Sequence, residues 1–406
     1  MSNFSPTHIQ EMLQALSSRP EIAALLADWP RLTASVVDEA LAIQAVPAPT
    51  FDEKRRRELV RERFSTLDLA DVAVDEIGNV WARTPGSQSH LPALMVSAHL
   101  DTVFSADTDL AIRRDATGRQ IVGPGLGDNS LGVAALLGLA RQLSERAIIP
   151  QSDIWWVATV GEEGLGDLCG MRHACARIGD DLGAVIVLEG LGLGRVYHAG
   201  LGVRRLKVEV RGPGGHSWLH SDRPSAIHQL IAIGAALIKQ VSPGENPRTS
   251  FNIGLIEGGD TINSRASHAS LSIDLRSEDP QALAAIERDV VAAITHTPCH
   301  PSLMVTTHVI GDRPYGRLHT EHPLVLAACA VLDAFEWRPV TLDIGSTDAN
   351  VPLSLGIPSV CIGLTTGGNA HTLEECIETP PLPTGMRQLT LLALAAADHL
   401  AQWAEW

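Results

Sequence analysis

Short apolar runs alternate with amphipathic stretches through the first half of the chain. Residues 94–98, 154–160 and 184–188 are mostly apolar runs of strand length, and residues 131–143 repeat apolar side chains with the 3.6-residue period of a helix. Residues before about 80 have the pattern of surface helices that lead into a strand. The alternation of strand and helix predicts an α/β fold with a mostly parallel sheet and helices on both faces.

The pattern changes near residue 203, where apolar and polar residues begin to alternate strictly. Such alternation is typical of strands that bury only one face. The predicted strands and helices follow one another as strand 205–211, helix 224–241, strand 251–255, strand 269–275, helix 280–295 and strand 303–310. This βαββαβ order predicts a ferredoxin-like α+β unit.

The α/β pattern returns after a predicted turn at residues 311–316. A helix at 323–335, strands at 340–343 and 359–362, and a helix at 389–403 complete the chain. We therefore expect a larger domain made of residues 1–200 and 312–406, interrupted by a smaller inserted domain of residues 201–311.

The charge balance bears on possible partners. Lys and Arg number 31 against 47 Asp and Glu, which gives a formal net charge of −16. Such an acidic chain argues against nucleic acid or an anionic membrane as a partner. The densest basic segment, residues 54–57, is followed by interleaved glutamates and predicts a solvated helix face.

Residues 1–20 contain Glu11 and no long apolar stretch, so we expect no signal peptide. No segment approaches the ~18 uninterrupted apolar residues of a membrane-spanning helix. The six cysteines show no C-x-x-C spacing, which favours free thiols in a reducing cytoplasm.

Candidate chemistry lies where apolar runs end or turns begin. Seven acidic and histidine residues occupy such positions: His99, Asp101, Asp128, Glu162, Glu163, Glu189 and His371. In a parallel α/β sheet, ligands gather outside the carboxyl ends of the strands, so one site could collect all seven. Carboxylates and imidazoles without a thiol suit a pair of divalent metals in a hydrolase.

Each motif also has a simpler interpretation. His99 and Asp101 fall on one side of an extended chain, as a metal ligand with a carboxylate behind it or as a polar pair at a strand end. Asp128 ends the segment Gly-Pro-Gly-Leu-Gly-Asp, which does not fit G-x-G-x-x-G. An acid there would repel a pyrophosphate but could bridge two metals, or simply cap the following helix.

Glu162 and Glu163 are adjacent on a turn, so one carboxylate can bind metal while the other faces a bound water. Two like charges at a strand end are hard to explain structurally. His216 follows two glycines, which suggests an imidazole positioned to reach a ligand. Arg276 falls on the face opposite its strand's apolar residues, where it could clamp a carboxylate or serve as an exposed structural arginine.

Taken in order, these motifs resemble the M20 metallopeptidases, a family of glutamate carboxypeptidases, di- and tripeptidases, deacylases and aminoacylases. The resemblance covers nearly the whole chain past residue 40. It rests on His99-x-Asp101, Gly-Asp128-Asn, Glu162-Glu163-Gly, Glu189, Gly-Gly-His216-Ser, Gly-x-Thr347-Asp348-Ala and His371. It implies a zinc-exopeptidase-like catalytic domain with an inserted lid or dimerisation domain.

The resemblance also implies a role for each matching residue. One metal would be held by His99, Asp128 and Glu189, and the other by Asp128, Glu163 and His371. Asp128 would bridge the metals, and its bond to Asn129 would be cis. Asp101 would orient His99, and Glu162 would be the general base. His216 would polarise the scissile carbonyl, often across a dimer. Asn263 and Arg276 would grip the substrate carboxylate. Many relatives have aspartate where this chain has Glu189.

These observations predict a cytoplasmic hydrolase with two divalent metal ions, acting on an amide bond of a small peptide. Zinc is favoured, and cobalt or manganese would suit the same ligands. We expect a homodimer formed through the inserted domain. The alternatives are an N-acyl amino acid deacylase with the same mechanism, a binding protein that has lost its chemistry, and a nucleotide-binding α/β protein. The intact metal positions argue against a binding protein without chemistry, and the acid in the glycine-rich loop argues against a nucleotide-binding protein.

Overall fold

The computed structural model describes residues 5–88 and 90–403 and separates into two compact units. Unit 1 comprises Met1–Gly200 and Gly316–Trp406, and unit 2 comprises Leu201–Tyr315. Within the described residues, no helix combines the length and the apolar character that crossing a membrane requires.

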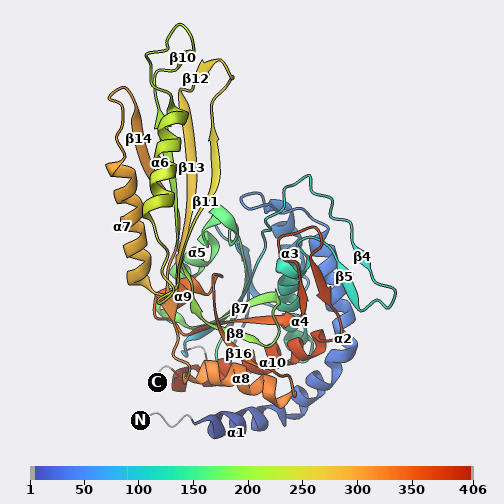
Figure 1. Cartoon of the computed structure of the whole chain (residues 1–406). Coiled ribbons are helices and arrows are strands. Elements are labelled where there is room, and N and C mark those ends of the chain that lie inside the picture. The colour runs from blue at the N-terminus through green and yellow to red at the C-terminus, as the bar shows by residue number, and fades with distance from the viewer. Residues whose placement is uncertain (1–4, 89, 404–406) are drawn as a thin grey trace. The chain divides into compact units, whose positions relative to one another are not determined.

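Unit 1 is built on one large sheet (Figure 1). Its strands lie in the order β1 (Ala70–Val74), β2 (Val80–Thr84), β6 (Ile154–Thr159), β3 (Ala93–His99), β7 (Leu182–Leu191), β17 (Ser359–Thr365), β8 (Arg195–Gly200) and β15 (Gly316–Arg317), and β16 (Thr341–Gly345) also pairs with β8. The central strands β6, β3, β7 and β17 are parallel, whereas β1, β2 and β15 pair antiparallel with their neighbours. The prediction of an α/β sheet is confirmed.

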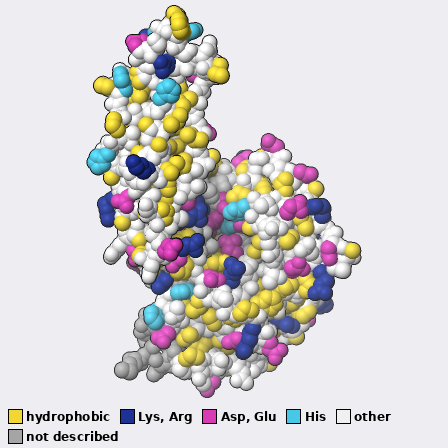
Figure 2. All heavy atoms as spheres, in the orientation of Figure 1, with side chains coloured by type: hydrophobic (Ala, Val, Ile, Leu, Met, Phe, Trp, Pro, Cys, Tyr) yellow, Lys and Arg dark blue, Asp and Glu magenta, His cyan; other side chains and the backbone are white. Residues whose placement is uncertain are grey.

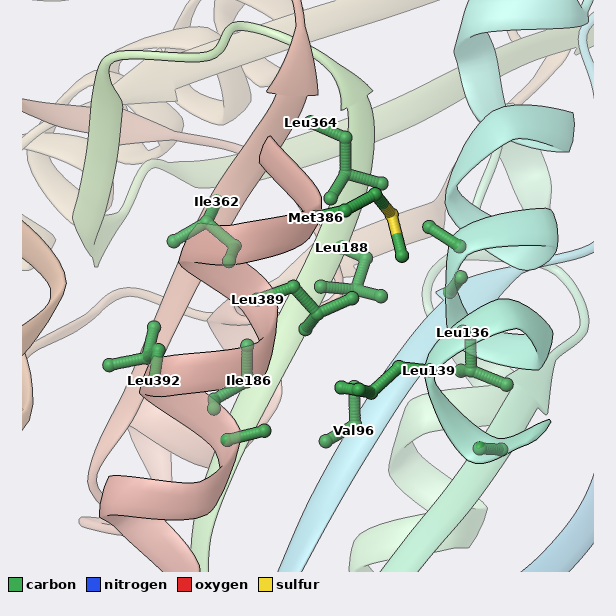
Figure 3. Close-up of a cluster of buried hydrophobic side chains, with 14 of the residues drawn as sticks. Val96, Leu136, Leu139, Ile186, Leu188, Ile362, Leu364, Met386, Leu389 and Leu392 are labelled. Carbon is green, nitrogen blue, oxygen red and sulfur yellow. The ribbon is translucent and has the colours of Figure 1, made fainter. Parts of the chain in front are cut away.

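The central strands bury side chains on both faces, so they read as nearly continuous apolar runs. Val96 of β3 and Ile186 of β7 belong to one core, and their neighbours Met95 and Val185 belong to another. Figure 3 shows the first core, where side chains of β3, β7 and β17 meet those of two helices, α4 (Leu131–Glu145) and α10 (Leu382–Trp403). The second core lies under α5 (Cys169–Ile178) and α9 (Asn350–Ser354).

Further helices complete unit 1: α1 (Pro6–Ser17), α2 (Pro20–Gln44), α3 (Lys54–Ser65) and α8 (Pro323–Ala334). The α2 helix is more deeply buried than a surface helix would be, because Trp29 is enclosed and donates from its indole nitrogen to Thr390 Oγ1 at 2.9 Å. A small sheet orders β18 (Gly367–Gly368), β19 (Cys376–Glu378), β5 (Gln120–Val122) and β4 (Arg113–Arg114).

Unit 2 has the predicted βαββαβ order. Its elements are β9 (Gly202–Arg211), α6 (Ala226–Gln240), β11 (Thr249–Gly258), β13 (His268–Ser277), α7 (Pro280–His296) and β14 (Met304–Arg313). The strands form an antiparallel sheet in the order β11-β13-β9-β14, and its buried face carries the alternating apolar residues of the sequence, such as Leu206 and Leu271. A short antiparallel pair, β10 (Gly215–His216) and β12 (Ser264–Arg265), forms a separate two-stranded sheet.

The predicted turn at 311–316 is wrong at its start, because β14 continues to Arg313. The pairing of β14 with β9 shifts register between Val309 and Gly311, with Ile310 as the extra residue, and the strand continues beyond this irregularity. The last helix also begins earlier than predicted, at Leu382 rather than near residue 389.

Candidate metal centre

Four neighbouring strands of unit 1 supply most of the candidate site. His99 is the last residue of β3, and Glu189 lies near the end of β7. Glu162 and Glu163 follow β6 directly, and His371 follows β17 after the short strand β18. Because β6, β3, β7 and β17 are parallel, their carboxyl ends meet at one edge of the sheet, where α/β proteins place their ligands.

Asp128 lies between two groups of side chains. Its Oδ1 is 3.1 Å from His99 Nε2, and its Oδ2 is 3.0 Å from His371 Nε2. His99 Nε2 is also 3.7 Å from Glu189 Oε2, and His371 Nε2 is 3.2 Å from Glu163 Oε1. One carboxylate therefore directs one oxygen toward each of two histidine–glutamate pairs.

Each pair could hold a metal ion together with Asp128. In both His99–Asp128–Glu189 and Asp128–Glu163–His371, one ligand atom from each residue lies within 4.8 Å of the others. Glu162 joins His99 and Glu163 in a further group of this kind. Oxygen and imidazole nitrogen donors without sulfur are compatible with zinc, manganese or cobalt. The donor set fits two divalent ions that share Asp128.

Asp101 organises the turn that carries the two glutamates. Its Oδ1 accepts the main-chain N–H of Glu162 at 3.0 Å, and its Oδ2 accepts that of Glu163 at 2.9 Å. His99 Nδ1 is 3.5 Å from the Asp101 carboxylate but only 3.0 Å from the Asp101 main-chain carbonyl oxygen. The shorter contact shows that the main chain of Asp101 is the nearer partner of the imidazole.

Asn129 connects the Asp128 loop to the strand that carries Glu189. Its amide nitrogen donates to the Leu188 carbonyl at 2.8 Å, and its amide oxygen accepts from the Gly190 N–H at 3.0 Å. These bonds lie on either side of Glu189 and fix the positions of Asp128 and Glu189 relative to each other. The Asp128–Asn129 bond is cis, as the family resemblance implied.

Glu375 is a buried carboxyl group that the sequence did not single out. Its Oε1 accepts the N–H of Gly127 at 2.7 Å and that of Asp128 at 2.9 Å, which fixes the loop from behind. The only signal in the sequence is an acid four positions after His371, and acids at such spacing are common in loops. The contact joins positions about 250 residues apart, so local pattern could not reveal it.

Arg56 corrects the prediction of a solvated basic helix face. Its side chain is buried, with Nε donating to the Val46 carbonyl at 3.0 Å and Nη1 to the Leu100 carbonyl at 2.8 Å. Burial lowers its pKa to about 10, while Asp101 favours the charged form. The arginine therefore holds the main chain at Leu100, the residue between His99 and Asp101.

Two more side chains behind the glutamate turn also escaped prediction. Thr50 Oγ1 donates to Asp101 Oδ2 at 2.8 Å, and Glu53 Oε1 accepts the N–H of Gly161 at 3.1 Å. Burial and the neighbouring Asp101 raise the pKa of Glu53. Asp348, in the Gly-x-Thr-Asp-Ala motif, is buried and accepts from Thr159 Oγ1 at 2.7 Å at the end of β6.

The site carries strongly coupled charges. Against the effect of burial, three surrounding carboxylates hold the pKa of His99 well above its ordinary range, and the two histidines lower that of Asp128. Asp128 and Glu163 raise the pKa of His371 to about 10. Burial raises the pKa of Glu189 to about 7, with the charges of Asp128 and Glu163 adding to the effect. Such a cluster retains protons that a bound cation would displace.

The remaining candidate residues lie in unit 2. His216 of β10 is paired in register with Ser264 of β12, and the Ser217 N–H donates to the Asn263 carbonyl at 2.9 Å, so the structure brings His216 and Asn263 close together. Both side chains are exposed.

Arg276 lies near the other end of β13. It is eight residues along the strand from His268, a separation of roughly 26 Å for extended chain. Its guanidinium contacts Asp274, with Nε 2.7 Å from Oδ1, and Asp274 also pairs with Arg205 at 3.1 Å. Arg265, three residues before His268, pairs with Gly215, so within unit 2 Arg276 is remote from the segment that carries His216 and Asn263.

A parallel-centred α/β sheet with carboxylates and imidazoles gathered at the carboxyl ends of its strands is typical of metal-dependent hydrolases. The family model described as peptidase family M20/M25/M40 matches residues 95–395, and the chain belongs to this family. The protein is therefore a hydrolytic enzyme. No curated protein sequence matches the chain.

Solved structures with the same fold cover nearly the whole chain. A tripeptidase from Staphylococcus aureus is 21% identical with a TM-score of 0.72, and the match covers 90% of this chain and 98% of that chain. A dinuclear metal binding peptidase of the M20 family from Bacillus subtilis is 14% identical, with a TM-score of 0.62 and coverage of 90% and 98%. A hydantoinase/carbamoylase family amidase from Burkholderia ambifaria is 20% identical, with a TM-score of 0.57 and coverage of 91% and 98%.

Proposed function

We propose that this protein is a dimetal exopeptidase that cleaves an amide bond of a small peptide, such as a di- or tripeptide. The observation that carries the proposal is the position of Asp128, whose two oxygens face two separate histidine–glutamate pairs. The family membership and the tripeptidase of the same fold support peptides as the substrate class.

His99, Asp128 and Glu189 would hold one divalent ion, and Asp128, Glu163 and His371 the other. When bound, the ions would lower the pKa of a water molecule and polarise the scissile carbonyl. Zinc is the favoured metal, and cobalt or manganese suit the same donors. The dinuclear metal binding described for the Bacillus subtilis peptidase supports this assignment.

Glu162 would act as the general base. Its main chain is fixed by the Asp101 carboxylate, and its side chain lies near His99 and Glu163. A Glu162 carboxylate oxygen would accept the proton of the attacking water and return it to the leaving nitrogen. Asp101 would hold the turn so that Glu163 binds metal while Glu162 faces the substrate.

His216 would donate a hydrogen bond to the scissile carbonyl, and Asn263 and Arg276 would bind the substrate carboxylate. Because His216 and Asn263 lie together while Arg276 lies far along β13, residues from two chains would have to meet on one substrate. We therefore propose a homodimer formed through unit 2. Hydrophobic side chains are visible on the surface of unit 2 (Figure 2), which supports this. The large exposed ones include Ile231, Ile238, Leu255 and Ile256.

A second candidate is an N-acyl amino acid deacylase with the same chemistry. The amidase of the same fold supports this candidate, because an amidase also cleaves its substrate by attack on an amide carbonyl. We further propose a cytoplasmic location, which the six free cysteines support, and no nucleic-acid or membrane partner, in keeping with the net charge of −16.

A hydrolysis screen tests the proposed function. The purified enzyme would be assayed against dipeptides, tripeptides and N-acyl amino acids, before and after chelation and after zinc is restored. We expect turnover of di- or tripeptides that is abolished by chelation and recovered with zinc. Turnover confined to N-acyl amino acids would favour the deacylase, and metal-independent hydrolysis would contradict the proposal.

A further inference from the structure

The turn after β10 closes around the ring of His220. The His220 Nδ1 accepts the main-chain N–H of His216 at 3.0 Å, and the His220 N–H donates to the His216 carbonyl at 2.9 Å. The main chain of His216 is therefore bonded to His220 through both its donor and its acceptor.

Gly215 shows how tightly this ring is packed. A Cβ atom at position 215 would lie 2.7 Å from His220 Nδ1 and 3.0 Å from its Cγ, so the ring would have to shift to accommodate it. The backbone of Gly215 also has a φ of +143°, which favours glycine. Arg223 also contacts this turn, with Nη1 donating to the Gly214 carbonyl at 3.2 Å. The backbone conformation of Gly215 and the close approach of the His220 ring thus both favour glycine at this position of the Gly-Gly-His motif.

The ring of His216 is oriented by its own turn. Its Nδ1 accepts the N–H of Trp218 at 3.2 Å and that of Leu219 at 3.4 Å. A ring nitrogen that accepts hydrogen bonds carries a lone pair, so in the neutral imidazole the proton resides on the other nitrogen. The His216 side chain consequently presents an Nε2–H donor to solvent.

We propose that His220 is a positioning residue for His216. By holding the main chain of residue 216, it keeps the N–H groups of Trp218 and Leu219 directed at Nδ1 and so selects the Nε2–H tautomer. That tautomer is the one able to donate to a substrate carbonyl and to the negative oxygen that develops from it. The effect of His220 on catalysis rests on the proposed function of His216. Its effect on the tautomer of His216 does not depend on that function.

Nuclear magnetic resonance of the whole chain tests this directly. Long-range ¹H–¹⁵N spectra of histidine-labelled protein distinguish the two tautomers, and His216→Ala identifies the His216 signals. We expect the Nε2–H pattern in the native enzyme. In His220→Phe, which removes the acceptor, the His216 signals should move toward a tautomer mixture. His220→Asn retains an acceptor oxygen near the Nδ1 position and should restore the native pattern.

Kinetics provide the second readout. We expect kcat to fall roughly 10- to 100-fold in His220→Phe with KM little changed, as for other misplaced catalytic groups, and to recover in His220→Asn. His308→Phe, on β14, serves as the control variant, and thermal unfolding verifies that each variant is folded. The Nδ1–H tautomer in native enzyme, or unchanged signals and kcat in His220→Phe, would overturn the proposal. Full activity in His216→Ala would instead refute the catalytic role of His216 and leave the tautomer result to decide on His220.

Discussion

At the scale of single residues, the candidate metal centre brings like charges close together. Asp128 and Glu189 lie against one imidazole, and Asp128 and Glu163 lie against another. In the absence of a cation, protons relieve this repulsion, which is why His371 has a pKa of about 10 and Glu189 a pKa of about 7. A divalent ion must displace those protons in order to bind.

Metal binding should therefore release protons. At pH 7 the free site holds a proton on His371, since its pKa of about 10 lies above that pH. We expect at least about one proton per chain to be released on saturation with Zn²⁺, and the apparent affinity to weaken roughly tenfold per unit as the pH falls. Calorimetric titrations in two buffers with different ionisation enthalpies measure the number released. A value of zero would contradict the arrangement described for His371 and Asp128.

The candidate site residues at strand ends were predictable from the sequence. The buried side chains that hold the main chain around them were not. His99, Glu162 and Glu189 end apolar runs, so the strand pattern alone draws attention to them. Glu375 and Arg56 act through contacts with residues distant along the chain. Arg56 belongs to the densest basic segment, but nothing in that pattern distinguishes it from its exposed neighbours Lys54 and Arg55. A charged residue in a loop, or among other charged residues of a helix, adds nothing to an apolar period, so only the folded chain shows that it is buried.

At the scale of elements, prediction succeeded where periodicity was strong. The α4 helix and strands β3, β6 and β7 match their apolar patterns closely. The β8 strand was missed because Gly192, Gly194 and Gly200 surround its short apolar segment and resemble a loop. Its conformation is stabilised by pairing with β17, β15 and β16, which come much later in the chain.

The start of α8 offers a test at this scale. His322 caps the helix, its Nδ1 accepting the Leu324 N–H at 3.1 Å, and burial lowers its pKa to about 4. The unfolded chain has a histidine pKa near 6.5, so between about pH 6.5 and 4 it binds the proton that the folded chain rejects. Folding stability from this group should therefore decline as pH falls through that window, by at most about 3 kcal/mol.

The variant His322→Asn isolates this contribution. Asparagine is a good helix cap and does not titrate, so the variant should keep the cap and lose the pH-dependent penalty. Urea unfolding of both proteins at pH 7 and pH 5 measures the difference. We expect the variant to gain stability relative to the native protein at the lower pH. An equal pH dependence in both proteins would show that His322 is not buried in the neutral form.

At the scale of the whole molecule, unit 2 carries features that a second copy would explain. The β11 strand is an edge of its sheet and exposes Leu255 and Ile256, an arrangement that invites pairing with another chain. On α6, Ile231 and Ile238 are two turns apart and both exposed, so they lie on one face. We expect a dimer in sedimentation velocity at micromolar concentration.

Ile238→Glu combined with Ile256→Glu should shift this dimer toward monomer, because a buried interface does not accommodate unpaired carboxylates. Val291→Glu on α7 is the matched control and should remain dimeric. Mixing the His216→Ala and Glu162→Gln variants tests whether His216 of one chain serves the site of the other. A mixed dimer would then contain one intact site, and the mixture should regain roughly a quarter of native activity. A monomeric native protein would refute the dimer.

The central claim is that adjacent glutamates divide the chemistry, with Glu163 binding metal and Glu162 moving the proton. Metal content by elemental analysis, measured beside kcat for Glu162→Gln and Glu163→Gln, tests it most directly. We predict that Glu162→Gln keeps both metals and near-native substrate affinity while kcat falls by at least ~10²- to 10⁴-fold, the contribution of a general base. Glu163→Gln should lose metal and activity together. Loss of metal in Glu162→Gln, or retention of more than about a tenth of its turnover, would contradict the account.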